Sequence, residues 1–201
     1  MRTNNLKILV FAAVALLSFS CKKSSAPGSK DIWTTYPTNG TIIWSIAIDS
    51  QGNKWFASFG NGLMKFDGAH WTTYDTSNSG LANNYPSVIA IDARGNKWIG
   101  SNGAGVSKFD GTNWTTYDAA NSGLPNAYAV SIAFDAQGNK WFGTSAGVSE
   151  FDGTHWTTYN TSNSGLYNKN APFNDEVGSI AIDAQGNKWF VGPGISELQQ
   201  Q

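Results

Sequence analysis

Gly138-Asn139-Lys140-Trp141-Phe142-Gly143 decides the fold, because closely similar stretches occur at 52–57, 95–100 and 186–191. The tryptophans of the four stretches lie 43, 43 and 48 residues apart along the chain. Self-similarity at a period of about 20 to 50 residues is typical of proteins built from stacked repeats. The sequence therefore predicts an array of four similar units.

Each unit is predicted to contain four short β-strands. In the third unit, segments of strand-like composition lie at 131–134, 139–144, 147–151 and 155–159. Between them stand Asp-, Gly-, Ser- and Asn-containing stretches, which favour tight turns. No segment has the length or period of a helix. Four antiparallel strands in about 43 residues are typical of one blade of a β-propeller.

The order of the segments predicts how the ring closes. The motif Trp-Thr-Thr-Tyr occurs at 33–36, 71–74, 114–117 and 156–159, and the chain ends shortly after a third-strand segment at 194–198. We therefore predict an all-β, closed four-bladed β-propeller at 31–198, in which the N-terminal strand at 31–36 completes the last blade. Closure would remove two exposed sheet edges. The alternative to such a monomer is an incomplete ring that pairs with a second copy to make eight blades.

The first thirty residues indicate export and anchoring. Residues 1–20 combine Arg2 and Lys7 with an apolar run at 8–17, as in a secretory signal peptide. The single cysteine, Cys21, follows small residues and resembles the lipidation site of bacterial lipoproteins. Lys22 follows it, so the resemblance implies sorting to the outer membrane. Residues 21–30 form the lipidated end and a flexible tether, and 199–201 form a tail.

Composition excludes two further classes of protein. The formal net charge is −1, without a basic cluster of the kind that binds nucleic acid. One cysteine cannot make a disulfide framework, so core packing must supply the stability.

The pattern Ser-Ile-Ala-x-Asp-x-x-Gly-Asn-Lys-Trp-Phe-Gly-Thr-x-x-Gly-Val-Ser-x-Phe-Asp-Gly, read at 131–153, resembles the two-component regulator propeller repeat. The resemblance covers essentially all of 31–198. It implies a propeller like those of periplasmic sensor regions of hybrid histidine kinases, which take part in recognising polysaccharide fragments. More distantly, the repeat is similar to that of streptogramin lyase. The chain has no kinase segment, so we expect a stand-alone propeller lipoprotein.

The residues common to the units are interpreted as architecture. We expect the four repeated tryptophans to pack between blades and Leu81, Leu124 and Leu166 to fill the grooves there. Asp49, Asp92, Asp135 and Asp183 are predicted to cap turns, since no second acid stands nearby to complete a calcium loop. His70 and His155 are predicted to be exposed turn residues. No catalytic residue, metal site or cofactor is predicted.

Function is expected where the units differ, in the connections between blades and the loops between second and third strands. The longest connection spans 160–178. Aromatic rings with neighbouring amides and hydroxyls suit sugars. The predicted ligand-binding residues are Trp44, Phe59, Asn61, Tyr85, Asn102, Tyr128, Ser145, Tyr167, Phe173, Asp175 and Glu176.

These observations predict a non-catalytic, lipid-anchored propeller of the bacterial cell envelope that binds a glycan through its variable loops. The first alternative is a subunit that assembles with another envelope protein. The second is an enzyme acting on a polysaccharide or a lactone, for which only Asp175 and Glu176 offer neighbouring acids.

Overall fold

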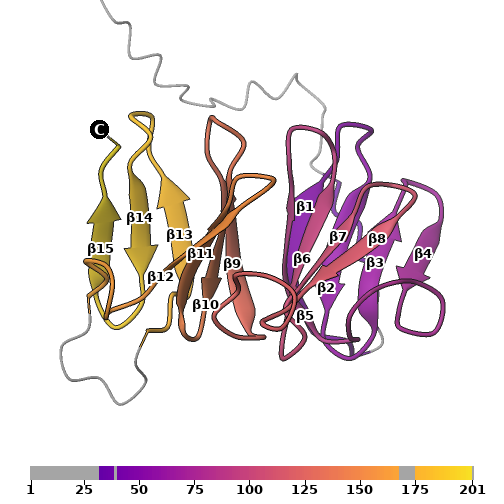
Figure 1. Ribbon diagram of the computed structural model, residues 1–201. Helices are drawn as coiled ribbons and strands as arrows, with labels where there is room; N and C mark the ends of the chain where they lie inside the picture. The colour runs from indigo at the N-terminus through magenta and orange to yellow at the C-terminus, as the bar shows by residue number, and fades with distance from the viewer. Residues whose placement is uncertain (1–31, 39, 168–174, 201) are drawn as a thin grey trace, which may run out of the picture. The chain divides into compact units, whose positions relative to one another are not determined.

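The computed structural model describes residues 32–38, 40–167 and 175–200. By their contacts, residues up to Pro37 form one unit and Thr38–Gln201 another. The described residues of the second unit are all β, with fifteen strands in four antiparallel sheets (Figure 1). We call the sheets blades 1 to 4. Their strands are β1 (Ile43–Ile48), β2 (Lys54–Ser58), β3 (Gly62–Phe66) and β4 (Trp71–Tyr74); β5 (Pro86–Ile91), β6 (Lys97–Ser101), β7 (Val106–Phe109) and β8 (Trp114–Tyr117); β9 (Ala129–Phe134), β10 (Lys140–Thr144), β11 (Gly147–Phe151) and β12 (Trp156–Tyr159); β13 (Ser179–Ile182), β14 (Lys188–Val191) and β15 (Ile195–Leu198).

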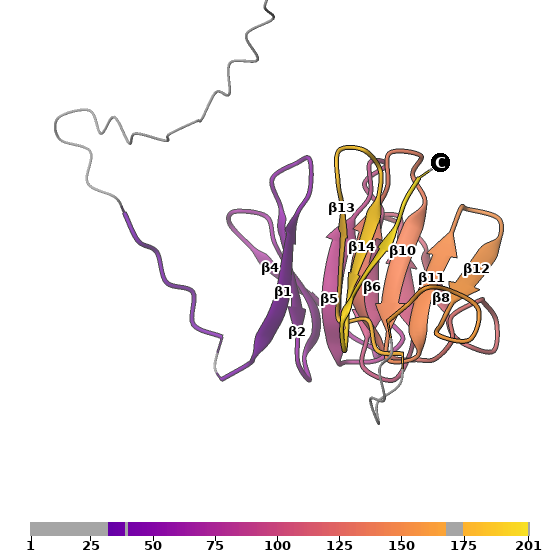
Figure 2. The ribbon, with the colours of Figure 1, turned by 90° about the vertical axis from the view of Figure 1, so that its left-hand side faces the viewer.

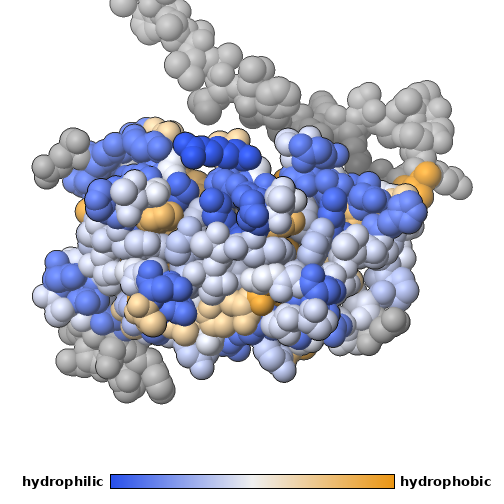
Figure 3. Space-filling view, turned by 45° about the vertical axis from the view of Figure 1, so that its right-hand side comes forward, coloured by the Kyte–Doolittle hydropathy of each residue, from blue (hydrophilic) through white to orange (hydrophobic). Residues whose placement is uncertain are grey.

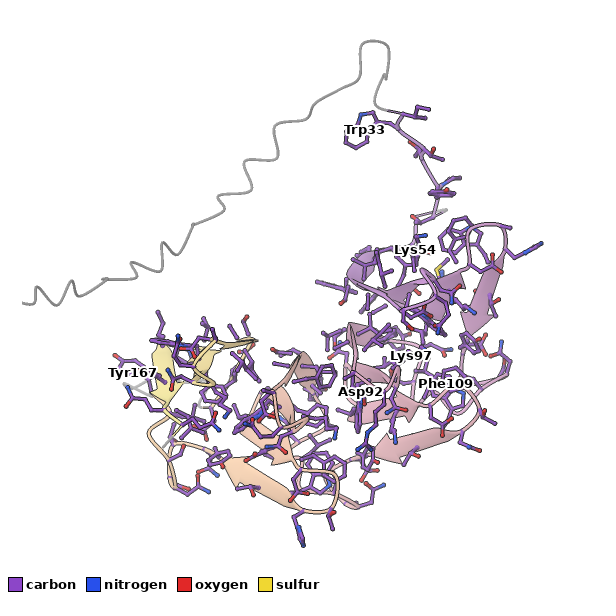
Figure 4. All side chains as sticks on the ribbon, turned by 90° about the horizontal axis from the view of Figure 1, so that it is seen from above. Trp33, Lys54, Asp92, Lys97, Phe109 and Tyr167 are labelled. Carbon is purple, nitrogen blue, oxygen red and sulfur yellow. The ribbon has the colours of Figure 1, made fainter. Side chains whose placement is uncertain are left out.

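Within each blade, consecutive strands are hydrogen-bonded neighbours, so every blade is a simple meander. The registers repeat: Trp55 lies opposite Lys65 in blade 1, and Trp98 lies opposite Lys108 in blade 2. Successive blades pack through their first strands, β1 on β5, β5 on β9 and β9 on β13. The four blades thus follow one another side by side in chain order (Figure 4).

One aspartate holds the turn between the first two strands of each blade. In blade 2, Oδ1 of Asp92 accepts the backbone N–H groups of Arg94 and Asn96, each at 2.9 Å. Its Oδ2 accepts the amide of Asn96 and, at 2.9 Å, the indole N–H of Trp98. Burial opposes ionisation, but these hydrogen bonds outweigh it and lower the pKa of Asp92. The arrangement recurs at Asp49, Asp135 and Asp183, which confirms that these aspartates cap turns.

The core lies between the blades and is largely aromatic. Trp55, Trp98 and Trp141 are at most 2% exposed, as predicted. Each stacks on the tyrosine that ends the fourth strand of its own blade, with ring centroids 5.7–5.8 Å apart. The next blade covers each ring with a lysine, whose Nζ lies 5.0–5.9 Å from the ring centroid. Buried apolar side chains complete this cover, among them Leu81 and Leu124, at 4% and 3% exposure.

Exposed turns also agree with the sequence. Asp67 accepts the backbone N–H groups of Ala69 and His70, and its pKa is lowered chiefly by the bond from His70. The side chains of His70 and His155 are 84% and 79% exposed. Each imidazole lies beside the aspartate of its own turn, and the two belong to different blades. Both are turn residues, as expected.

Ring closure is the part of the predicted fold that the structure does not show. Blade 4 has three strands, β13–β15, and residues 32–38 form no strand. Trp189, the counterpart of the three buried tryptophans, is 37% exposed. The predicted signal peptide at 1–20, Cys21 and the tether to residue 30 lie outside the described residues.

Candidate functional site

Three exposed aromatic rings line a hollow where blades 1 and 2 meet. Trp44 stands on β1, Phe59 follows β2, and Tyr85 precedes β5. The rings of Trp44 and Phe59 lie 6.2 Å apart at 64°, and those of Phe59 and Tyr85 lie 5.1 Å apart at 67°. All three are 42–60% exposed. The hollow has a volume of about 280 Å³, and its other lining residues are Pro86, Ser87, Asn102 and Val130.

Backbone hydrogen bonds fix the rings at this end of the blades. The backbone N–H of Phe59 donates to the carbonyl of Ile42 at 2.9 Å, which continues the β1–β2 ladder beyond Ser58. In blade 2, Asn102 donates in the same way to the carbonyl of Tyr85 at 2.9 Å. The ring of Tyr85 lies against Gly60, where an added Cβ would come within 3.9 Å of the ring. The aromatic positions therefore follow from the strand ends.

The hollow is neutral. None of its seven lining side chains is an acid or a base. Asn102 lines the hollow, and its backbone carbonyl accepts a 3.0 Å hydrogen bond from the side chain of Asn83. Ser87 is already engaged, since its hydroxyl donates to the carbonyl of Ala129 at 2.6 Å. Such a surface can offer ring stacking and a few directional polar contacts to an uncharged ligand.

Three other predicted residues lie near the hollow without lining it. Tyr128 pairs with Asn102 through an isolated β-bridge, and Ser145 donates its backbone N–H to the carbonyl of Tyr128 at 3.3 Å. Asn61 donates its side-chain amide to the hydroxyl of Thr41. These residues extend the aromatic and polar surface from blade 1 toward blade 3.

The remaining predicted residues gather elsewhere, beside blade 4. Tyr167, Asp175 and Glu176 line a crevice of about 10 Å³, room for about one water. Asp175 accepts the backbone N–H of Thr161 at 3.3 Å, and the ring of Tyr167 packs on Gly194, where an added Cβ would come within 2.1 Å. Phe173 lies outside the described residues. The predicted set therefore divides into two groups.

Sequence reasoning missed three lining residues, Pro86, Ser87 and Val130. A signal was present, because Trp44, Ser87 and Val130 are 43 residues apart and occupy the same place in three consecutive units. In a repeat protein, equivalent positions in neighbouring units lie next to each other. Once Trp44 was a candidate, its two counterparts were candidates as well.

Among the described residues, no cluster of three or more His, Cys, Asp or Glu side chains could hold a metal ion. The same part of the chain contains no helix long and apolar enough to cross a membrane.

Comparisons with known proteins establish the fold class. The profile of no known protein family matches the chain, and neither does any curated protein. Among solved structures, the extracellular domain of a hybrid two-component system protein from B. thetaiotaomicron is similar, with a TM-score of 0.70 and 24% identity over 86% of this chain and 24% of that one. The virginiamycin B lyase of Staphylococcus aureus, in a catalytically inactive form, gives a TM-score of 0.60 and 17% identity over 83% of this chain and 58% of the lyase.

PorZ, a surface component of the type-IX secretion system of Porphyromonas gingivalis, gives a TM-score of 0.58 and 18% identity over 83% of this chain and 28% of PorZ. The chain thus spans less than two thirds of each of these proteins. At such identities, the likeness establishes a propeller-like all-β fold.

Proposed function

We propose that this chain is an exported, non-catalytic binding module that holds part of a neutral glycan in the hollow formed by Trp44, Phe59 and Tyr85. The observation that carries the proposal is the exposure of three rings around one open, uncharged space. Contiguous exposed apolar groups are typical of ligand-binding grooves and interaction sites, and these rings lie outside the core, which is built between the blades. The apolar faces of sugar rings stack on such side chains while amides bind their hydroxyls.

The size of the hollow limits the ligand. Pockets for small molecules commonly measure about 300 to 1,000 Å³, and this one, at about 280 Å³, lies at the lower end. It would take one or two sugar rings of a longer chain, with the rest passing over Tyr128 and Asn102. The likeness to an extracellular domain supports an exported location for such a module.

Binding should be tested with the full-length chain against a panel of neutral and acidic glycans, first by thermal shift and then by calorimetry. A ligand at 100 times its Kd raises stability by about 2.7 kcal/mol. We expect one neutral class to bind, and Trp44→Ala and Tyr85→Ala each to weaken binding at least about tenfold, which equals about 1.4 kcal/mol.

Tyr167→Ala is the matched control, because Tyr167 is as exposed as Tyr85, at 46% each, but lies beside blade 4. Binding that survives Trp44→Ala and fails with Tyr167→Ala would move the site away from the hollow. A panel without any binder would refute the glycan proposal.

We also propose that Cys21 carries the lipid that anchors the module to the outer membrane. The support is the signal-like segment at 1–20 followed directly by this cysteine. Two or more acyl chains give stable anchoring, since each buried methylene contributes about 0.8 kcal/mol. Metabolic labelling with an alkyne fatty acid should mark the wild-type chain and leave Cys21→Ala unmarked. Labelling of the variant would disprove the anchor.

A further inference from the structure

We propose that two copies of this chain join through the exposed faces of blades 1 and 4, so that each copy completes the other's fourth blade in an eight-bladed ring. The proposal is independent of any ligand. It rests on an interface that occurs three times within the chain and whose two halves are left exposed at its ends.

The exposed half on blade 1 is the face of β1 that its counterparts bury. Ile46 is 56% exposed, whereas Ile89, at the same place in blade 2, is 4% exposed because blade 1 covers it. Ile48, on the same face of β1, is 61% exposed. On the side of the molecule drawn in Figure 3, by contrast, apolar residues form only small patches among hydrophilic ones. A row of apolar side chains on one strand face is typical of an interaction surface.

The exposed half on blade 4 surrounds Trp189 (Figure 2 views the molecule from the side of this blade). Trp189 keeps the hydrogen bond to its capping aspartate, Asp183, at 3.1 Å, yet it is 37% exposed, against at most 2% for the other three tryptophans. Among the described residues, no blade packs over its ring. Each tryptophan of blades 1 to 3 is covered by a lysine at the start of the second strand of the following blade: Lys97, Lys140 or Lys188.

Blade 1 carries the matching lysine, Lys54, at the start of β2 (Lys54 and Lys97 are both labelled in Figure 4). Lys188 shows what it would do, since its Nζ lies 5.3 Å from the ring of Trp141 and 3.9 Å from Oδ2 of Asp135. By the same geometry, Lys54 of one copy would cover Trp189 and face Asp183 of the other. The apolar and charged groups of the two end faces are therefore complementary.

The repeat also indicates which segment supplies the fourth strand that blade 4 lacks. In blades 1 to 3, the residues of Trp-Thr-Thr-Tyr pair with the third strand so that Trp71 lies opposite Phe66 and Tyr74 opposite Leu63. Transferred to blade 4, this register sets Trp33 opposite Leu198 and Tyr36 opposite Ile195, which is 68% exposed. In blades 1 to 3, the fourth strand precedes the first strand of the next blade along the chain. The segment 33–36 precedes blade 1 in the same way. It would therefore complete blade 4 of the copy against which its own blade 1 packs.

The blade 1 that packs against blade 4 is more readily supplied by a second copy than by the same chain. The reason is that the repeated packing of one blade on the next does not bring blades 1 and 4 of one chain together. Among the described residues, each blade meets the next through its first strand, but β13 has no comparable contact with β1. A fourth interface of the same kind therefore adds a new blade after blade 4. Two chains close the ring with two identical interfaces related by a twofold axis, which is the commonest symmetry of oligomers.

One position of blade 4 departs from the pattern. Val191 stands where Gly100 and Gly143 approach the next blade, and a Cβ on either glycine would come within 2.5 Å of a carbonyl oxygen there. Blade 1 has Ala57 at this place, fully buried, so one methyl group is accommodated. The larger side chain of Val191 must therefore hold the two copies slightly further apart at this position than two blades of one chain. Val191→Ala should therefore strengthen the dimer.

Disulfide trapping in the full-length chain, solubilised in detergent, tests the proposal. Ser45 of blade 1 accepts a 3.2 Å hydrogen bond from the backbone N–H of Ile89 in blade 2. Their counterparts across the proposed interface are Ser179 of one copy and Ile46 of the other. Differently tagged Ser179→Cys and Ile46→Cys chains, mixed and oxidised, should form a mixed disulfide dimer. The Ser45→Cys/Ile89→Cys double variant is the positive control and should form its bond within one chain.

The double variant Ser179→Cys/Ile46→Cys separates the outcomes. Linked dimers, together with a wild-type sedimentation mass that equals two chains, support the proposal. A disulfide within one chain at monomer mass would overturn it in favour of a ring closed by the chain itself. Absence of any disulfide while the control pair forms would overturn it too. Wild-type chains, which contain Cys21 alone, set the background.

Discussion

Replacing Asp92 by alanine should cost much more than replacing Asp67, although both aspartates hold tight turns. Asp92 accepts four hydrogen bonds, one of them from the indole of Trp98, which is 1% exposed. Without the carboxylate, the indole N–H is left unsatisfied in the core, at a cost of about 1 to 3 kcal/mol, and each of the other bonds contributes about 0.5 to 1.5 kcal/mol. Asp67 accepts two bonds from exposed backbone groups.

We therefore expect the free energy of unfolding to fall by about 3 to 7 kcal/mol in Asp92→Ala. The loss in Asp67→Ala should be much smaller, because water can replace the carboxylate at its exposed backbone groups. Urea unfolding followed by tryptophan fluorescence measures both, and an unchanged slope would show that the midpoint shift reports stability. Asp92→Asn keeps the shape and one acceptor oxygen and should fall between them. Equal losses of stability in the two alanine variants would refute the view that the hydrogen bond to the buried indole makes Asp92 more important than Asp67.

Three further outcomes are expected. Burial opposes ionisation of Asp49 and Asp92, but hydrogen bonds lower the pKa of both. The stability that these groups contribute is therefore present above the ordinary aspartate pKa of about 3.9 and is lost as the pH falls through the lowered values. Melting temperatures measured from pH 2 to 7 should fall in that acidic range. Burial and the nearby Glu150 raise the pKa of Tyr159 to about 12, so the stability that Tyr159 contributes is full below pH 10 and is lost toward 12. Burial also raises the pKa of Tyr74 and Tyr117, so absorbance at alkaline pH should show late-titrating tyrosines, one fewer in Tyr159→Phe. Leu124→Ala should cost about 2 to 5 kcal/mol in urea unfolding, because Leu124 is 3% exposed between two blades.

The strands and turns could be predicted from the sequence because they depend on local chemistry. Asp-x-x-Gly-Asn-x-Trp contains the acceptor, the glycine and the donors of one turn within seven residues, and Gly95 has the positive φ, 81°, that the turn requires. Closure could not be predicted in the same way. The number of blades in a ring depends on how far each blade rotates against the next, and a repeat period carries no information about that angle.

The types of residue in the candidate site could be predicted from the sequence, but which of them lie together could be predicted only in part. Loop aromatics with neighbouring amides identified Trp44, Phe59, Tyr85 and Asn102, which the structure brings together. The same criterion also selected Tyr167, whose ring packs on Gly194 beside blade 4. Composition alone does not distinguish a ring that faces an open hollow from one that covers a glycine, because that depends on which blades meet.

The meander order of the blades also governs how the chain can fold. Every strand pair within a blade joins segments that are close in sequence, so each blade closes only short loops, and such local contacts form fast. The last strand of blade 4 is different, since the proposed pairing of 33–36 with β15 joins residues from opposite ends of the chain. If that strand comes from a second copy, its docking is a bimolecular step. The kinetics of folding would then contain a fast phase independent of protein concentration, from the blades, and a slower one that accelerates as the concentration rises.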